Sequence, residues 1–249
     1  MKRLISSKCI IILMIGLPYI YGEEETVGLH IILSNLFWWS SLILVIKAYR
    51  NRQMWNVGDT PWTFLFMTFF FFGIRELGHL SSSPMVGTLR YILGIWSAIF
   101  MTTAFLYLFF IIYKRKKVPD NMIYLPFAFA LLFPALLLYL WFSGTGIENI
   151  KNTISSLENL IWICGSSITI YTTYLLGTRS TGGFVYVFML FQFAALASIL
   201  WKCIGFISSI SCPVPYSIRE IIETLFGILA ISAMYVLTKM LVKLSKDIS

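Results

Sequence analysis

Charged residues are scarce in this chain, and their scarcity excludes most soluble folds. Asp, Glu, Lys and Arg make up 12% of the 249 residues, whereas soluble domains contain about a quarter. Hydrophobic residues account for 58%, and the mean hydropathy is +0.82. The composition therefore predicts an integral membrane protein in contact with the lipid bilayer, with little chain left for a soluble domain.

The sequence also lacks the short motifs that mark common enzyme classes. It has no H-E-x-x-H zinc motif, G-x-S-x-G elbow, P-loop or G-x-G-x-x-G fingerprint. This absence favours a function without catalysis. The formal charge of +8 is explained by the topology of the loops, so we expect no nucleic-acid partner.

The amino terminus has the layout of a secretory signal peptide. Three basic residues precede the apolar run from Cys9 to Ile20, and Gly22 is followed by three glutamates. We expect residues 1–22 to be a signal peptide cleaved near Gly22, with an uncleaved signal anchor as the alternative. Residues 23–249 would then form a single domain.

The rest of the chain predicts an all-α bundle of seven transmembrane helices. Each apolar segment has about 20 residues or more, enough to cross the hydrocarbon core of a bilayer. The predicted spans are 28–48, 61–81, 88–113, 121–143, 156–177, 182–207 and 217–243. Small residues that permit close helix contact are Gly73, Gly78, Gly94, Gly165 and Gly227.

Basic residues are distributed unequally over the predicted loops. They gather after the first, third and fifth spans and in the tail, as Lys47, Arg50, Arg52, Lys114, Arg115, Lys116, Lys117, Arg179, Lys239, Lys243 and Lys246. Because cytoplasmic loops carry such an excess, we predict an external amino terminus and a cytoplasmic carboxyl terminus, in the cytoplasmic membrane of the cell.

Ionisable residues within the spans lie toward the predicted outer side. The candidate ligand-binding residues are Arg75, Glu76, His79, Arg90, Lys202 and Glu223. Buried charges in a membrane are costly unless paired or hydrated, so we expect Glu76 to pair with Arg75 or Arg90. A pair of Lys202 with Glu223 is a structural alternative, as is a network that only anchors helix ends.

Two further glutamates fit helix capping. Ser155 with Glu158, and Ser217 with Glu220, match the S-x-x-E capping box. We therefore expect both glutamates to begin helices on the outer side, and Glu220 to have a structural role.

The only two histidines are predicted at similar depth on consecutive antiparallel helices. His30 and His79 could hold a haem between them, or a divalent metal with Glu76 as a third ligand. An ordinary interfacial role for both histidines is the main reading, so no cofactor is predicted beyond this alternative.

Cysteines allow one outer disulfide. Cys203 and Cys212 flank the predicted turn between the last two spans, where an oxidising environment permits them to pair.

Together these patterns favour a sensor or receptor-like module with an outward-facing polar vestibule. It would bind a small molecule from the outer side and contact a signalling partner in the membrane or the cytoplasm. A small-molecule or ion transporter, a haem or metal redox protein, and a non-catalytic assembly subunit are the alternatives.

Overall fold

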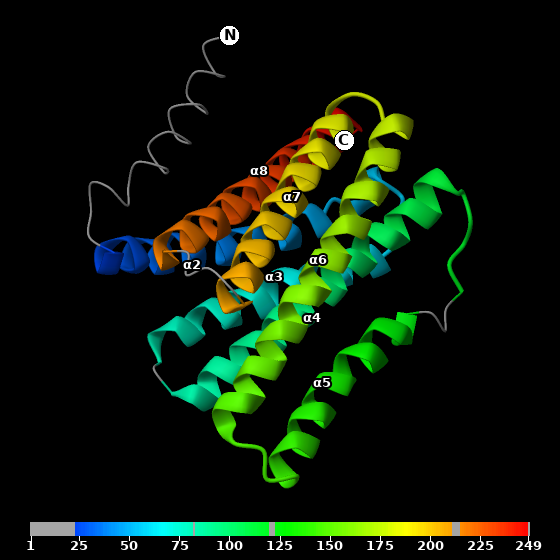
Figure 1. The fold of residues 1–249 in the computed structure, drawn as a ribbon. Helices are drawn as coiled ribbons and strands as arrows, with labels where there is room; N and C mark the ends of the chain where they lie inside the picture. Colours follow the sequence, from blue (N-terminus) through cyan, green and yellow to red (C-terminus); the bar gives the residue numbers. More distant parts are fainter. Residues whose placement is uncertain (1–22, 82, 120–122, 211–214, 249) are drawn as a thin grey trace.

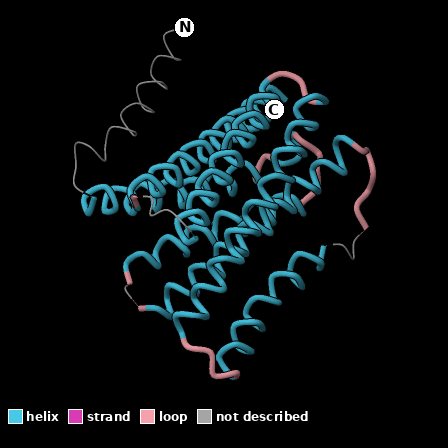
Figure 2. The backbone as a smooth tube through the Cα atoms, in the orientation of Figure 1, coloured by secondary structure: helices cyan, strands magenta, loops and turns pink. Residues whose placement is uncertain are grey.

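A computed structural model shows an all-helical bundle (Figure 1). It describes residues 23–81, 83–119, 123–210 and 215–248. The α-helices of that part are α2 (Glu23–Tyr49), α3 (Thr60–Leu77), α4 (Pro84–Leu108), α5 (Leu125–Phe142), α6 (Ile147–Arg179), α7 (Gly183–Ile210) and α8 (Tyr216–Ile248). Short helices are η1 (Arg52–Met54), η2 (Gly78–Leu80) and η3 (Phe109–Tyr113), and loops join the rest (Figure 2). The predicted signal peptide, residues 1–22, lies outside the described residues.

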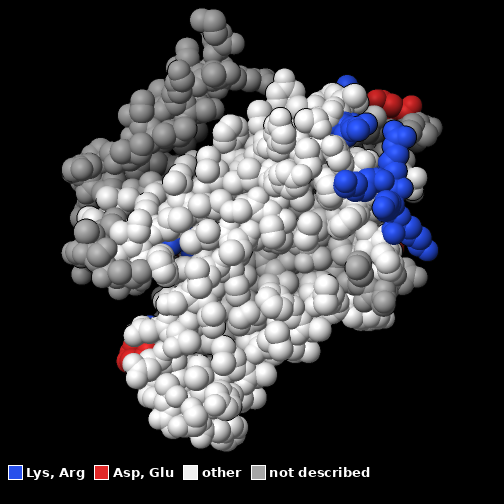
Figure 3. Space-filling view, turned by 45° about the vertical axis from the view of Figure 1, so that its right-hand side comes forward, with Lys and Arg blue, Asp and Glu red and all other residues white. Residues whose placement is uncertain are grey.

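Six of these helices are long and apolar enough to cross a membrane. Their candidate spans are Gly28–Tyr49, Pro84–Tyr113, which runs from α4 through η3, Leu125–Phe142, Ile147–Arg179, Gly183–Ser208 and Ser217–Asp247. α3 is not among them. Figure 3 shows Lys and Arg side chains gathered at one end of the visible face and few charges over its middle. These features support a multi-pass membrane protein with lipid around its helices.

The helices form a closed ring with one helix outside it. α2 packs against α3 and α8, α4 joins α3 to α6, and α7 joins α6 to α8. α5 lies at the edge, against α4 and α6 (Figure 1). The six ring helices therefore surround a common interior, and α5 adds Ala130, Phe133 and Leu137 to the buried core from outside the ring.

α5 differs from the ring because it is apolar on nearly every side. Phe133 and Leu137 face the bundle, whereas Leu131 and Phe142 are 65% and 84% exposed. A helix of this kind loses little by facing hydrocarbon, which explains its peripheral position in a membrane bundle.

The predicted start of the fifth span was wrong. α6 begins at Ile147 instead of residue 156, because Ile150 and Ile154 continue its buried face toward the amino terminus. Ser155 therefore lies within α6 and does not cap it, and Ser217 lies within α8, which begins at Tyr216. The Ser155 capping box therefore does not form, and both Glu158 and Glu220 make contacts inside the bundle.

Candidate functional site

Every helix of the ring contributes charged or imidazole side chains to one buried cluster. We call it the ionic cluster. α2 supplies His30, α3 with η2 supplies Arg75, Glu76 and His79, α4 supplies Arg90, α6 supplies Glu158, α7 supplies Lys202, and α8 supplies Glu220 and Glu223. All except His79 and Arg90 are almost fully buried. Sequence positions separated by up to about 190 residues thus meet at one level of the bundle.

Arg75 lies at the centre of this cluster. Its Nη1 contacts Glu76 and lies 2.6 Å from Glu223 Oε1, while its Nε lies 3.3 Å from Glu158 Oε1. The predicted pairing of Glu76 with a basic neighbour is confirmed. One guanidinium therefore joins carboxylates from α3, α6 and α8, and its planar fork suits such shared contacts.

Lys202 pairs with a different residue from the one predicted. Its Nζ lies 2.7 Å from Glu158 Oε2, whereas Glu223 contacts Arg75. Both Lys202 and Glu158 are 0% exposed. A pair buried to this extent is costly to break, because removal of one partner leaves an uncompensated charge.

Gly94 makes room for Glu158 beside α4. A Cβ atom at this position would collide with the Glu158 carboxylate and would lie 3.2 Å from Arg75 Nε. The predicted role of Gly94 in close helix contact is confirmed. The space left by its missing side chain is filled by the charged side chain of Glu158 from α6.

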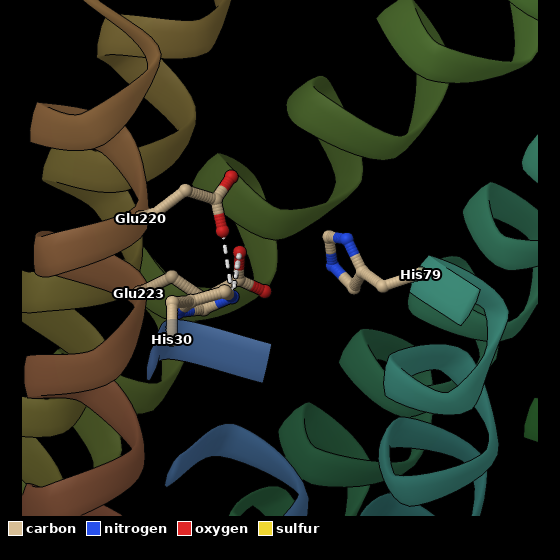
Figure 4. Close-up of side chains that lie close together, drawn as sticks. All are labelled: His30, His79, Glu220 and Glu223. Atoms are coloured by element: carbon tan, nitrogen blue, oxygen red, sulfur yellow. Dashed lines mark ion pairs between the residues drawn. The ribbon is translucent and has the colours of Figure 1, made fainter. Parts of the chain in front are cut away.

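The two histidines lie close together, as their predicted depth indicated. Their ring centroids are 5.6 Å apart, in an edge-to-face arrangement. His30 Nε2 lies 2.6 Å from Glu220 Oε2, and His79 approaches from the other side of the same glutamates (Figure 4). Ligand atoms from His30, His79, Glu220 and Glu223 all lie within 4.8 Å of one another. We call these four residues the histidine–glutamate quartet.

His79 follows the end of α3 and contacts Arg90. The Arg90 Nη2 group donates a hydrogen bond to His79 Nε2, and Arg90 Nε donates to the Arg75 carbonyl oxygen at 3.2 Å. Because a guanidinium N–H can only donate, His79 Nε2 is the acceptor of this hydrogen bond.

Packed aromatic rings lie next to the ionic cluster, further into the bundle. This aromatic layer consists of Trp38, Phe72, Trp162, Trp201 and Phe226. The Arg75 guanidinium lies 4.8 Å from the Phe72 ring centroid, and Lys202 Nζ lies 3.6 Å from that of Trp201. The rings therefore close the inner side of the cluster and favour its cations through cation–π contacts.

A polar pocket opens beside the ionic cluster, between α6, α7 and α8. Its volume is about 570 Å³, and Asn and Ser side chains of α6 and Arg219 of α8 line it. Asn159 Oδ1 and Arg219 Nε are buried without a hydrogen-bond partner among the described residues. None of the six predicted ligand-binding residues lines this pocket.

A second pocket lies at the other end of α3. It has a volume of about 500 Å³ and is lined in part by Arg115, Lys116 and Lys117. This basic end is where the sequence predicts contact with the cytoplasm and with anionic lipid headgroups.

The structure brings all six predicted ligand-binding residues into one cluster, although their proposed role stays a prediction. The structure adds Glu158 and Glu220 to this cluster, two residues that the sequence assigned to helix capping. It also places Asn159 and Arg219, which belong to no sequence motif, in the neighbouring pocket. A four-residue spacing could have revealed Glu158, because Trp162 and Ser166 continue the same buried face. Cys212 lies outside the described residues, so its pairing with Cys203 also stays a prediction.

Comparison of the chain with protein-family models, with curated proteins and with solved structures finds no match. The functional argument therefore rests on the site itself.

Proposed function

We propose that this chain is a seven-helix membrane sensor or receptor-like module that binds a small anion from the outer side. α3 would be the seventh span. Arg75 and Glu76 lower its hydropathy, but both side chains face the interior of the ring, where they cost less than in lipid. The external amino terminus and cytoplasmic carboxyl terminus follow from the excess of basic residues on alternate loops.

The observation that carries this proposal is the contribution of all six ring helices to one ionic cluster. Its charges are buried and mutually paired, so a change at any pair alters the balance for the others. A bound ligand that shifts one contact can therefore change how several helices pack, which is the physical requirement of a sensor.

The pocket between α6, α7 and α8 supplies a place for that ligand. Arg219 Nε offers a hydrogen-bond donor with positive charge, and the hydroxyls of Ser155 and Ser156 can donate as well. This set of donors suits a carboxylate or a phosphate. Asn159 lines the pocket, and the residue before it in the chain, Glu158, belongs to the ionic cluster. The two sites therefore share one turn of α6.

The aromatic layer favours sensing over transport. Its rings pack across the interior from α2, α3, α6, α7 and α8, with contacts such as the 4.0 Å stacking of Trp38 on Phe72. A solute entering from the side of the ionic cluster would meet a dense apolar barrier. A receptor needs an entrance on one side, whereas a transporter needs a route past such rings.

The proposal is tested with the purified full chain in lipid nanodiscs. Acetate and inorganic phosphate are titrated at constant ionic strength, and intrinsic tryptophan fluorescence reports on Trp162 and Trp201 beside the cluster. We expect a saturable change with at least one anion. Arg219→Gln should weaken it about 10-fold or more, since a hydrogen bond to a charged group contributes about 1.5–3 kcal/mol.

Lys151→Gln provides the matched control. Lys151 is another cation at this end of α6, but it is paired with Glu148 at 3.4 Å on the surface. This variant should respond as the wild type does. The absence of a saturable response to either anion, or an equal response in Arg219→Gln, would overturn the proposal.

The orientation has a separate test. Reporter fusions after Lys117 and after Ser249 should both report the cytoplasm, and a fusion after Thr145, in the turn between α5 and α6, should report the outer side. The opposite result at any of the three sites would contradict the proposed topology.

A further inference from the structure

We propose that the histidine–glutamate quartet binds one divalent transition-metal ion of the zinc class, with Glu76 as an additional carboxylate. Two imidazoles and two carboxylates, from α2, η2 and α8, offer ligand atoms within 4.8 Å of one another. In Figure 4 the His79 ring points toward the glutamates of α8 from the opposite side to His30. This site uses none of the residues that line the proposed anion pocket.

The spacing of the ligand atoms suits a shared cation better than direct hydrogen bonds. Glu76 Oε2 lies 3.7 Å from His30 Nε2 and 3.6 Å from His79 Nε2. Glu223 Oε2 lies 3.8 Å from His30 Nε2. Two ligands of a tetrahedral zinc ion with bonds of ~2.0–2.1 Å are separated by ~3.3–3.4 Å. The contacts of Glu76 and Glu223 would therefore contract by a few tenths of an ångström, whereas the 2.6 Å contact of His30 Nε2 with Glu220 Oε2 would lengthen as the ion replaces the shared proton.

Neighbouring groups already orient the carboxylates. Arg75 Nη1 contacts Oε1 of both Glu76 and Glu223, which leaves Oε2 of each turned toward the histidines. Glu76 Oε2 is buried and has no hydrogen-bond partner among the described residues. Carboxylates held in this way by an outer partner are typical of metal sites.

Thr224 fixes the tautomer of His30. Its hydroxyl donates to the Glu220 carbonyl oxygen at 2.8 Å, so it accepts from His30 Nδ1 at 2.7 Å. With the proton on Nδ1, the Nε2 lone pair faces the oxygens of Glu76, Glu220 and Glu223. The 2.6 Å contact of this lone pair with Glu220 Oε2 requires a shared proton between the two atoms or a metal ion in its place.

The donor set selects the class of metal. Mixed imidazole and carboxylate ligands suit zinc and its first-row neighbours, whereas calcium and magnesium prefer oxygen ligands alone. The edge-to-face contact of the two rings favours a single ion over a haem, because a porphyrin would require the rings to separate. Because Arg90 donates to His79 Nε2, His79 coordinates the ion either through Nδ1 or through Nε2 after the Arg90 guanidinium has moved off it.

The test is zinc binding by the full chain in nanodiscs. Protein stripped with a chelator and then dialysed is loaded with Zn²⁺, and elemental analysis should find one tightly bound ion per chain. Co²⁺ in its place should give a visible ligand-field absorption. His30→Gln or Glu220→Gln should weaken zinc binding about 100-fold or more, measured by competition with a chromophoric chelator.

Glu148→Gln is the matched control. It removes an exposed carboxylate of α6 and should leave zinc affinity unchanged. Because loss of a buried charge can prevent folding, Thr224→Val is a second test that keeps every charge. It removes the partner of His30 Nδ1 and should weaken zinc binding ~10–100-fold. Thr238→Val, on the same helix, should not.

Two outcomes would overturn the metal proposal. If the stripped wild type binds no zinc, the cation at His30 is a proton. If zinc binds equally to the wild type, Glu220→Gln and Thr224→Val, it lies elsewhere. Arg219→Gln should retain zinc binding, so failure of the anion proposal and failure of the metal proposal are distinguishable.

Discussion

The ionic cluster and the aromatic layer occupy neighbouring levels of the same helix ring but are stabilised in opposite ways. On α6, Glu158 belongs to the cluster, Trp162 to the aromatic layer, and Ser166 lies one turn further on. On α2, His30, Ser34 and Trp38 follow the same spacing. One turn of α6 and two turns of α2 therefore separate charged contacts from aromatic packing.

This comparison teaches where the bundle tolerates change. Rings in the aromatic layer interact through non-directional packing, so a neighbour can adjust when one of them shrinks. Charges in the ionic cluster depend on specific partners, and loss of one leaves another buried without compensation. The cluster is thus the level at which a small chemical event has large structural consequences.

Glu158→Gln should give the largest effect in a series along α6. It preserves side-chain size but removes the partner of Lys202 Nζ at 2.7 Å and of Arg75 Nε at 3.3 Å. We expect a loss of ~3–5 kcal/mol in unfolding free energy, measured by equilibrium unfolding in mixed micelles. Glu148→Gln, on the exposed part of the same helix, should cost ~0–1 kcal/mol. Equal effects would show that burial does not distinguish the two pairs.

Gly94→Ala should have the next largest effect, because it disturbs the same carboxylate from α4. The added methyl group would collide with Glu158 and displace it from Arg75 and Lys202. We expect a cost of about 2 kcal/mol, in the range of overpacked cores. Gly177→Ala is the control, since a Cβ there meets nothing within 4 Å. A neutral Gly94→Ala variant would mean that Glu158 can move freely.

Trp162→Phe should be milder, because it keeps an aromatic ring in the aromatic layer. Trp162 Nε1 has no hydrogen-bond partner among the described residues, so the change removes ring volume and no such bond. We expect about 1–1.5 kcal/mol, with unchanged zinc binding. A loss greater than that of Glu158→Gln would reverse the proposed ranking of the two levels.

Apolar patterns predicted much of this fold, whereas the contacts within the site were less accessible. Seven apolar runs correspond to the long helices α2 to α8, and the pairing of Glu76 and the proximity of His30 to His79 followed from their positions. The partner of Lys202 could not be predicted in this way, because the order of the spans does not reveal which of their side chains point toward one another. The local capping pattern also misled for Glu158, since the buried face of α6 continues from Ser155 back to Ile150 and overrides it.

Ser166→Ala extends the series to the smallest expected effect. The Ser166 hydroxyl lies 2.6 Å from that of Ser198 on α7, and both are fully buried. Ser198 also donates to the Ala195 carbonyl oxygen at 2.7 Å, so it keeps a partner after the change. Hydrogen bonds between membrane helices contribute ~0.6 kcal/mol on average, and we expect a loss of that size in the same unfolding measurement. A cost above ~2 kcal/mol would show that neutral polar contacts beyond the aromatic layer matter as much as the charges before it, and the contrast between the two levels would fail.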